Sequence, residues 1–368
     1  MSRKILPSLL TLLLISSVLL FTRCETEVDL LAPYKVTPII YGVLDFEADT
    51  QFFRINKTYL GEGDNNLYAG IKDSVEFPLG EVQGWIIKRI GSGVVDSFEL
   101  EAIDKPFREP GLFYNTNVRF YYTAETLLTP EEITAVRLST GDRPYFEMAV
   151  NAVGETYTAE SVFPLVNSSS IVVPVASVII FRSDFYVTDG QGAFREQNFR
   201  YDRHPSGGRY EADLRVVYDV DFTDGTTAFN EFFDYRIDSR DNSGSGITNI
   251  FFGTRNWYEF AGARFRAIPN AERIRIHYLE YILSAANQDF ATYLSVAQPV
   301  SQLVPVLSEF TNISGGAIGL FASRTHISRP IYLTEPSLEQ LSTGNLTSGP
   351  CYCVTWTGTN YNCETVCP

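Results

Sequence analysis

At 368 residues the chain is long enough for two domains of roughly 100–200 residues each. Its 45% of hydrophobic residues and its 26 Gly and 18 Pro exclude a collagen-like or wholly disordered protein. The net charge of −15 disfavours nucleic-acid binding, because the protein's own field would repel phosphates. The three histidines, His204, His277 and His326, are scattered, so we expect no metal site and no cofactor.

The first 23 residues have the pattern of a secretory signal peptide. Arg3 and Lys4 precede a mainly apolar run from Leu9 to Phe21 that contains no acidic residue. This run is shorter than the roughly 20 residues that a membrane-spanning helix needs. Cleavage of the segment is therefore favoured over a permanent transmembrane anchor.

Cys24 follows the apolar run almost directly. The sequence Phe21-Thr22-Arg23-Cys24 resembles a bacterial lipobox, in which the cysteine is acylated and begins the mature chain. Arg23 departs from that pattern, which has a small residue there, and the alternative is a free or buried Cys after an ordinary signal cleavage. Because acyl chains contribute about 0.8 kcal/mol per buried CH₂ and a lone exposed thiol is a liability, we expect lipidation at Cys24. Residues 24–33 would then be an acidic tether, similar to the surface-export signals of lipoproteins in Bacteroidetes-type bacteria.

The remaining cysteines all lie in a Cys-rich tail, residues 348–368. An even number in an exported chain predicts two disulfides, with the first two cysteines bonded to the last two in either order. A four-thiolate zinc site is the alternative, but C-x-C and C-x₃-C lack the usual C-x₂-C pairs, and exported thiols oxidise. The cysteines concerned are Cys351, Cys353, Cys363 and Cys367.

Residues 34–165 are predicted to form an immunoglobulin-like β-sandwich. Short runs of strand-forming residues are separated by Gly, Pro, Asp and Asn clusters, which fits a sandwich better than alternating strands and helices. A polar, aperiodic segment at 165–170 marks the expected domain boundary. The predicted strands are Pro38–Leu44, Phe52–Leu60, Gly84–Arg89, Val118–Thr123, Ala135–Ser139, Tyr145–Val150 and Thr156–Phe163.

Residues 166–347 are predicted to form a second β-rich domain with one or two short helices, so the whole chain is expected to be mainly β. Period-two alternation and an Asp-Gly turn predict a hairpin, and a 3.6-residue apolar period before Pro299 predicts a helix. The expected order is a strand at Ile171–Phe181, a polar stretch at Asp189–Gly208, the hairpin Asp213–Phe222 with Phe229–Ile237, a helix at Asn256–Phe265, a strand at Ile274–Ile282 and a helix at 286–297.

Two segments invite a ligand interpretation that their spacing does not support. Asp219, Asp221 and Asp224 suggest Ca²⁺, but the positions that need Gly and Glu in an EF-hand hold Asp224 and Asn230. We expect a solvated strand face that ends in a turn. Gly315–Gly319 is not followed by the Lys and Ser/Thr of a phosphate-binding loop, so we expect a strand bulge or a close approach to another backbone.

No arrangement of nucleophile and base is recognisable, so no catalytic residue is assigned and a non-enzymatic protein is expected. His277 alternates with apolar residues in a predicted strand, which favours a structural role. A long polar connection is the possible binding loop, because scaffolds place recognition on such loops. It comprises Gly61, Glu62, Gly63, Asp64, Asn65, Asn66 and Tyr68.

Four segments resemble an uncharacterised family of Bacteroidetes outer-membrane lipoproteins, a domain of unknown function. They are Cys24 with its acidic followers, Pro38–Leu44, Ala291–Leu294 and Asn312–Ser323. The last segment is the distinctive one, with Asn312, Gly315, Gly316, Gly319 and Phe321. Members of that family often accompany TonB-dependent receptors, and the resemblance implies no catalytic residues.

We therefore expect a lipid-anchored outer-membrane protein that faces the cell surface. Its expected partner is an outer-membrane β-barrel protein, either a TonB-dependent receptor or export and assembly machinery. The alternative is a glycan-binding module or adhesin, since 14% of the residues are aromatic and such side chains can stack on sugars. A secreted hydrolase is the least favoured hypothesis.

Overall fold

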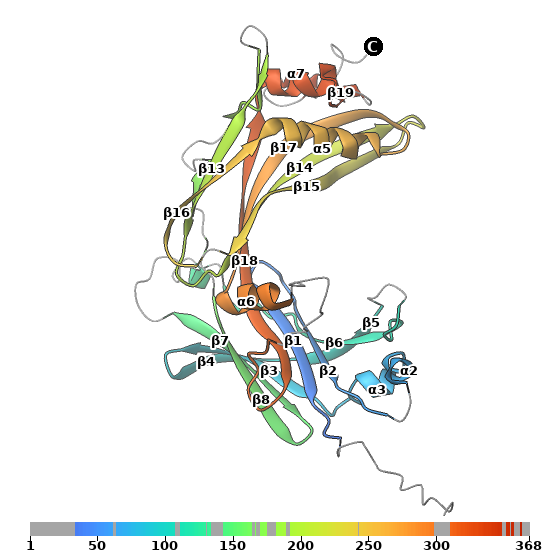
Figure 1. The fold of residues 1–368 in the computed structure, drawn as a ribbon, viewed down its shortest axis with the longest axis vertical. Coiled ribbons are helices and arrows are strands. Elements are labelled where there is room, and N and C mark those ends of the chain that lie inside the picture. The colour runs from blue at the N-terminus through green and yellow to red at the C-terminus, as the bar shows by residue number, and fades with distance from the viewer. Residues whose placement is uncertain are drawn as a thin grey trace, which may run out of the picture. The chain divides into compact units, whose positions relative to one another are not determined.

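The protein, described here from a computed structural model, is mainly β, as the period-two alternation predicts (Figure 1). The chain divides into two compact units, Met1–Val36 and Thr37–Pro368, and every element below belongs to the second. The described residues are 34–61, 64–106, 111–129, 131–133, 143–163, 166, 170–174, 182–188, 192–241, 243–297 and 310–347, with the backbone alone of 351–353, 355–356 and 361–362.

A ten-stranded sheet has the order β15-β14-β17-β18-β1-β2-β6-β5, with β10 paired to β18 and β19 to β17. The first half of β18 pairs in parallel with β1, and its second half pairs antiparallel with β17. Strands from both sides of the expected boundary at 165–170 thus share this sheet, and the division into 34–165 and 166–347 stays a prediction. Its strands are β1 (Pro38–Asp45), β2 (Gln51–Lys57), β5 (Glu101–Lys105), β6 (Val118–Thr123), β10 (Arg182–Ser183), β14 (Arg209–Phe222), β15 (Thr227–Asp241), β17 (Ala271–Ala286), β18 (Ile318–Leu333) and β19 (Cys351–Cys353).

A four-stranded sheet in the order β4-β3-β7-β8 contacts the part of the large sheet that contains β1 and β18. Phe46, just after β1, packs on Phe146 of β7 with ring centroids 5.3 Å apart. The Ser323 hydroxyl of β18 donates to the Val162 carbonyl of β8 at 2.8 Å. The strands are β3 (Gln83–Ile90), β4 (Gly93–Glu99), β7 (Pro144–Ala152) and β8 (Glu155–Val162).

A hydrophobic core lies between the β14-β17 part of the large sheet and the elements that cover it. The buried Trp257 and Phe265 of α5 belong to it, with Tyr218 of β14 and Tyr281 of β17. The expected polar stretch Asp189–Gly208 contains a strand in which the alternate residues Phe199 and Tyr201 are buried. The prediction of a polar stretch is therefore wrong at this strand. The remaining strands are β9 (Ile171–Val173), β11 (Tyr186–Val187), β12 (Ala193–Phe194), β13 (Glu196–Arg203), β16 (Gly246–Gly253), β20 (Thr355–Trp356) and β21 (Tyr361–Asn362).

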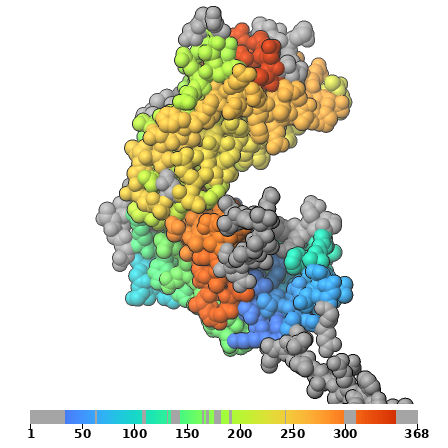
Figure 2. Space-filling model, in the orientation of Figure 1, coloured from blue at the N-terminus to red at the C-terminus, as the bar shows by residue number. Residues whose placement is uncertain are grey.

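Both predicted helices are confirmed, as α5 (Thr254–Arg266) and α6 (Gln288–Ala297). The Asn287 side chain caps α6 by accepting from the Phe290 N–H at 3.1 Å, and α6 lies at the surface shown in Figure 2 (orange). It buries Ala291 rather than the predicted apolar stripe. The pattern did not predict α2 (Asn65–Ala69), α3 (Lys72–Val75) and α7 (Glu335–Thr343). None of the helices in the described residues is long and apolar enough to span a membrane.

The predicted hairpin is confirmed as β14 and β15, and the predicted strand Ile274–Ile282 lies within β17. Six strands of the expected sandwich are confirmed, as β1, β2, β3, β6, β7 and β8. Two strands that the pattern did not predict, β4 and β5, lie among them. The predicted strand Ala135–Ser139 lies outside the described residues. Of the predicted strand Ile171–Phe181, the first three residues form β9, and residues 175–181 lie outside the described residues.

Candidate functional site

Most of the cysteine predictions lie outside the described residues. This holds for Cys24, the tether 24–33, Cys363 and Cys367. The backbone of Cys351–Cys353 forms β19, in parallel with Arg273–Arg275 of β17. Lipidation and disulfide bonding thus stay predictions.

The possible binding loop includes a short helix. The Asp64 carboxylate accepts from the Asn66 N–H at 2.9 Å and so caps α2. The Tyr68 ring packs towards Tyr59, with centroids 6.4 Å apart, while Leu67 is 70% exposed. Glu62 and Gly63 lie outside the described residues, and a binding role for this loop stays a prediction.

Hydrogen bonds within and next to the distinctive Asn312–Ser323 segment stabilise the start of β18. The Asn312 amide donates to the Phe321 carbonyl at 2.7 Å and accepts from the Phe321 N–H at 2.9 Å. The Thr311 hydroxyl accepts from the Gly319 N–H at 3.1 Å. A Cβ at Gly319 would lie 1.8 Å from the Ile40 carbonyl oxygen of β1. The prediction that these glycines allow a close approach to another backbone is confirmed at Gly319.

The acidic segment on β14 does not converge on a cation position. Asp219 Oδ1 lies 2.9 Å from His277 Nε2, while Asp221 accepts from Arg275 at 2.7 Å. Asp224 accepts from Thr226 in the predicted turn. Burial alone would raise the pKa of Asp219, but bonds from the Asn230 N–H and His277 outweigh it and hold that pKa below its usual value. Asp219 is therefore a buried, paired carboxylate rather than part of a solvated face.

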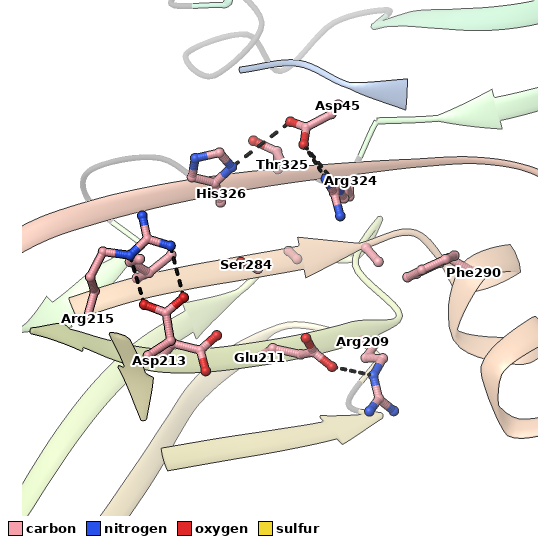
Figure 3. A pocket seen from close by; sticks show the side chains of 14 residues that line it. Asp45, Arg209, Glu211, Asp213, Arg215, Ser284, Phe290, Arg324, Thr325 and His326 are labelled. Atoms are coloured by element: carbon pink, nitrogen blue, oxygen red, sulfur yellow. Dashed lines mark hydrogen bonds and ion pairs between the residues drawn. The ribbon is translucent and has the colours of Figure 1, made fainter. Parts of the chain in front are cut away.

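A charged cleft of about 270 Å³ lies on the face of the large sheet formed by β14, β17, β18 and the end of β1 (Figure 3). The strand register aligns Arg209, Ala286, Arg324 and Asp45 across these four strands. The charged cleft is lined by Asp45, Arg209, Glu211, Asp213, Arg215, Asp234, Ile282, Ser284, Ala285, Ala286, Phe290, Arg324, Thr325 and His326.

Each of the three arginines that line the charged cleft holds a carboxylate. Arg215 donates two bonds to Asp234, at 2.8 and 2.9 Å. Arg209 donates to Asp241 at 2.8 Å, and Arg324 donates to Asp45 at 2.8 Å. Within each pair the positive and negative charges largely offset each other. The charged cleft therefore presents polar groups of fixed geometry to a ligand, and its net attraction or repulsion is weak.

Asp45 and His326 of the charged cleft lie close to Glu47, and we call these three residues the donor triad. Their ligand atoms all lie within 4.8 Å of one another. His326 Nδ1 is 4.0 Å from Asp45 Oδ1 (Figure 3). It is 3.8 Å from Glu47 Oε2. Burial raises the pKa of Glu47, although the Thr325 hydroxyl and the His326 N–H donate to its carboxylate.

Sequence analysis missed the donor triad. Asp45 and His326 are far apart in the sequence, and the parallel pairing of β1 with β18 brings them together. Parallel pairing between distant strands leaves no local pattern, so no signal in the sequence marks these residues as a group.

An aromatic face, which we call the exposed aromatic face, lies on the β1-β2-β6 part of the large sheet. It comprises the exposed Tyr41 and Phe52 and the half-buried Phe120 and Tyr122. The rings of Phe52 and Tyr122 are nearly parallel, at 29°, with centroids 6.0 Å apart. Phe52 is 40% exposed, and the Lys105 Nζ lies 4.5 Å from its ring centroid. The Tyr122 hydroxyl donates to Glu101 at 2.9 Å. The face therefore combines aromatic and hydrogen-bonding groups.

The charged cleft, the donor triad and the exposed aromatic face are the surface features from which a function can be argued. Comparison with known proteins assigns none of them a role. No protein-family model matches the chain, and no curated protein is similar to it.

Proposed function

We propose that this chain is a lipid-anchored, non-enzymatic binding protein of a bacterial outer membrane that faces the cell surface. Its partner is a β-barrel protein of that membrane, either a TonB-dependent receptor or export and assembly machinery. One observation carries the proposal: Cys24 lies three residues after the end of the apolar run Leu9–Phe21 and precedes Glu25, Glu27 and Asp29. An acylated cysteine at this position would hold the body at the membrane surface, where such partners are found.

The strand order supports an immunoglobulin-like sandwich as the first part of this body. Labelled A to G along the chain, β1-β2-β6-β5 has the order A-B-E-D of one sheet of such a sandwich. The order β4-β3-β7-β8 corresponds to C′-C-F-G of the other sheet. This fold serves many binding functions, so it supports the proposal without choosing the ligand. In an exported protein of this kind the tail cysteines form two disulfides.

The charged cleft supports binding rather than catalysis. Asp45 and Asp234 each accept hydrogen bonds from an arginine of the charged cleft, Arg324 and Arg215 respectively. Paired Arg and Asp groups suit the recognition of polar groups on a partner.

Cys24→Ser is expected to move the protein from the membrane fraction to the soluble fraction, because the acyl chains would no longer be attached. The measurement is immunoblotting of fractionated cells. Cys353→Ser is the matched control and should leave the membrane fraction unchanged. Unchanged fractionation of Cys24→Ser would show that acylation is not the anchor.

Purification of the acylated chain from detergent-solubilised outer membranes is expected to recover a β-barrel protein at a comparable amount. Mass spectrometry of the purified sample identifies this partner, and the Cys24→Ser protein from the soluble fraction is the control. Recovery of the anchored chain alone, at its native abundance, would contradict the proposed partner.

A glycan-binding module is the second candidate, and the exposed aromatic face favours it. Sugar rings stack on aromatic side chains, and Phe52 and Tyr122 offer neighbouring, nearly parallel rings. Glu101 and Lys105 beside them could bond to hydroxyl groups, although Lys105 would have to leave the face of Phe52. If the chain purifies alone but is retained on a polysaccharide gel, this candidate replaces the first.

A further inference from the structure

We propose that the donor triad of Asp45, Glu47 and His326 binds a divalent transition-metal ion such as Zn²⁺. The site goes beyond the proposed function and does not depend on it, because it rests on side chains of the described body alone. Its ligands would be His326 Nδ1, one oxygen of Asp45 and one oxygen of Glu47. The remaining coordination positions would be open to the charged cleft, which Asp45 and His326 line.

The spacing of the three donors fits a shared ion. Zn²⁺ binds imidazole nitrogen and carboxylate oxygen at about 2.0–2.2 Å, so ligand atoms around one ion lie roughly 3.5 Å apart. His326 Nδ1 lies 3.8 Å from Glu47 Oε2 and 4.0 Å from Asp45 Oδ1. The ligand atoms of Asp45 and Glu47 lie within 4.8 Å of each other, so rotations of the three side chains would bring all three donors to this spacing. The backbone need not move, because β1 and β18 are already paired at Asp45 and Arg324.

Neighbouring groups orient both carboxylates. Arg324 donates to Asp45 Oδ2, which leaves Oδ1 on the side of His326. The Thr325 hydroxyl donates to Glu47 Oε1 at 2.9 Å, so Oε2 is the oxygen nearer the imidazole. Outer partners of this kind fix ligand geometry in metal sites. Arg324 also offsets part of the negative charge, and we therefore expect micromolar rather than nanomolar affinity.

The donor set selects the class of ion. An imidazole nitrogen suits Zn²⁺, Fe²⁺, Co²⁺ or Ni²⁺, whereas Ca²⁺ takes six to eight oxygen ligands. Three protein ligands with open positions are typical of zinc sites that bind a further ligand. In this protein the further ligand would be water or a polar group that enters the charged cleft.

Calorimetric titration of the full chain with Zn²⁺ is expected to show a site of 1:1 stoichiometry. His326→Gln should weaken this binding by more than about 100-fold, since even an outer partner of a metal ligand is worth about 10–100-fold. His277→Gln is the matched control, because His277 also lies in a strand of the same sheet beside a carboxylate but outside the donor triad. Its affinity should equal that of the unchanged chain.

Two further measurements keep the test decisive. Glu47→Gln keeps the side-chain shape and should also weaken binding, while thermal unfolding shows that each variant is folded. X-ray absorption at the zinc edge should show nitrogen and oxygen ligands. Sulfur ligands would assign the ion to the cysteine tail and overturn the proposal, as would unchanged affinity in folded His326→Gln.

Discussion

Replacement of Gly319 by alanine is expected to lower the free energy of unfolding by more than about 4 kcal/mol. Losses of this size are exceptional and arise from severe steric clashes or backbone strain. A Cβ at this position would lie 1.8 Å from the carbonyl oxygen of Ile40. That neighbour is backbone in the parallel pair of β1 and β18, so it cannot move without breaking the pairing. The φ of +136° adds strain, because side-chain-bearing residues rarely adopt it. Urea unfolding followed by tryptophan fluorescence measures the loss.

Gly316→Ala is the matched control for this prediction. Gly316 has a φ of +84°, but no atom lies within 4 Å of a Cβ built there. Only the left-handed backbone then opposes the substitution, at a cost of about 1–2 kcal/mol. Equal losses in the two variants would show that strain, and not the approach to Ile40, makes glycine necessary at position 319.

The hairpin of β14 and β15 could be predicted from the sequence because its determinants are local. One face of β14 is apolar at every second residue, and Gly225 takes the φ of +82° that the turn requires. The helix α5 was also predictable from local sequence, because the aromatic and small residues on one of its sides are buried in the core. Such elements need no knowledge of their distant neighbours.

Elements with less regular burial were not predictable. β4 is exposed at all but one position, so its residues follow no apolar alternation. In β13, Phe199 and Tyr201 are buried between charged and amide residues, which hides the period. In the first half of β18, Gly319–Ser323 are all buried, because α6 and β8 both contact the strand. A strand covered on both faces loses the alternation on which the prediction depends.

The charged cleft and donor triad could not be predicted because they depend on register between distant strands. Arg324 and His326 lie on alternate positions of β18, and the register sets them beside Asp45 and Ser284 respectively. A shift of one residue would turn both side chains to the opposite face. The sequence thus shows that charges alternate along each strand, but only the sheet shows which charges face each other.

Trp257→Ala is expected to lower the free energy of unfolding by about 3–5 kcal/mol, the range for an aromatic residue removed from a core. Trp257 is 0% exposed, and its ring lies 5.1 Å from that of Phe185 and 4.9 Å from that of Tyr258. The cavity would thus open between α5 and the residues that pack on it. Thermal and urea unfolding, with circular dichroism as the signal, measure the loss.

Trp257→Phe separates packing from hydrogen bonding at the same position. The buried indole Nε1 has no acceptor among the residues that the structure describes, so phenylalanine removes an unmet donor together with part of the ring. We therefore expect a loss of no more than about 1.5 kcal/mol. Phe251→Ala, at a residue 60% exposed on the neighbouring β16, should change stability by less than about 0.5 kcal/mol. If Trp257→Phe were as damaging as Trp257→Ala, the indole N–H would be bonded in the native protein and the packing argument would fail.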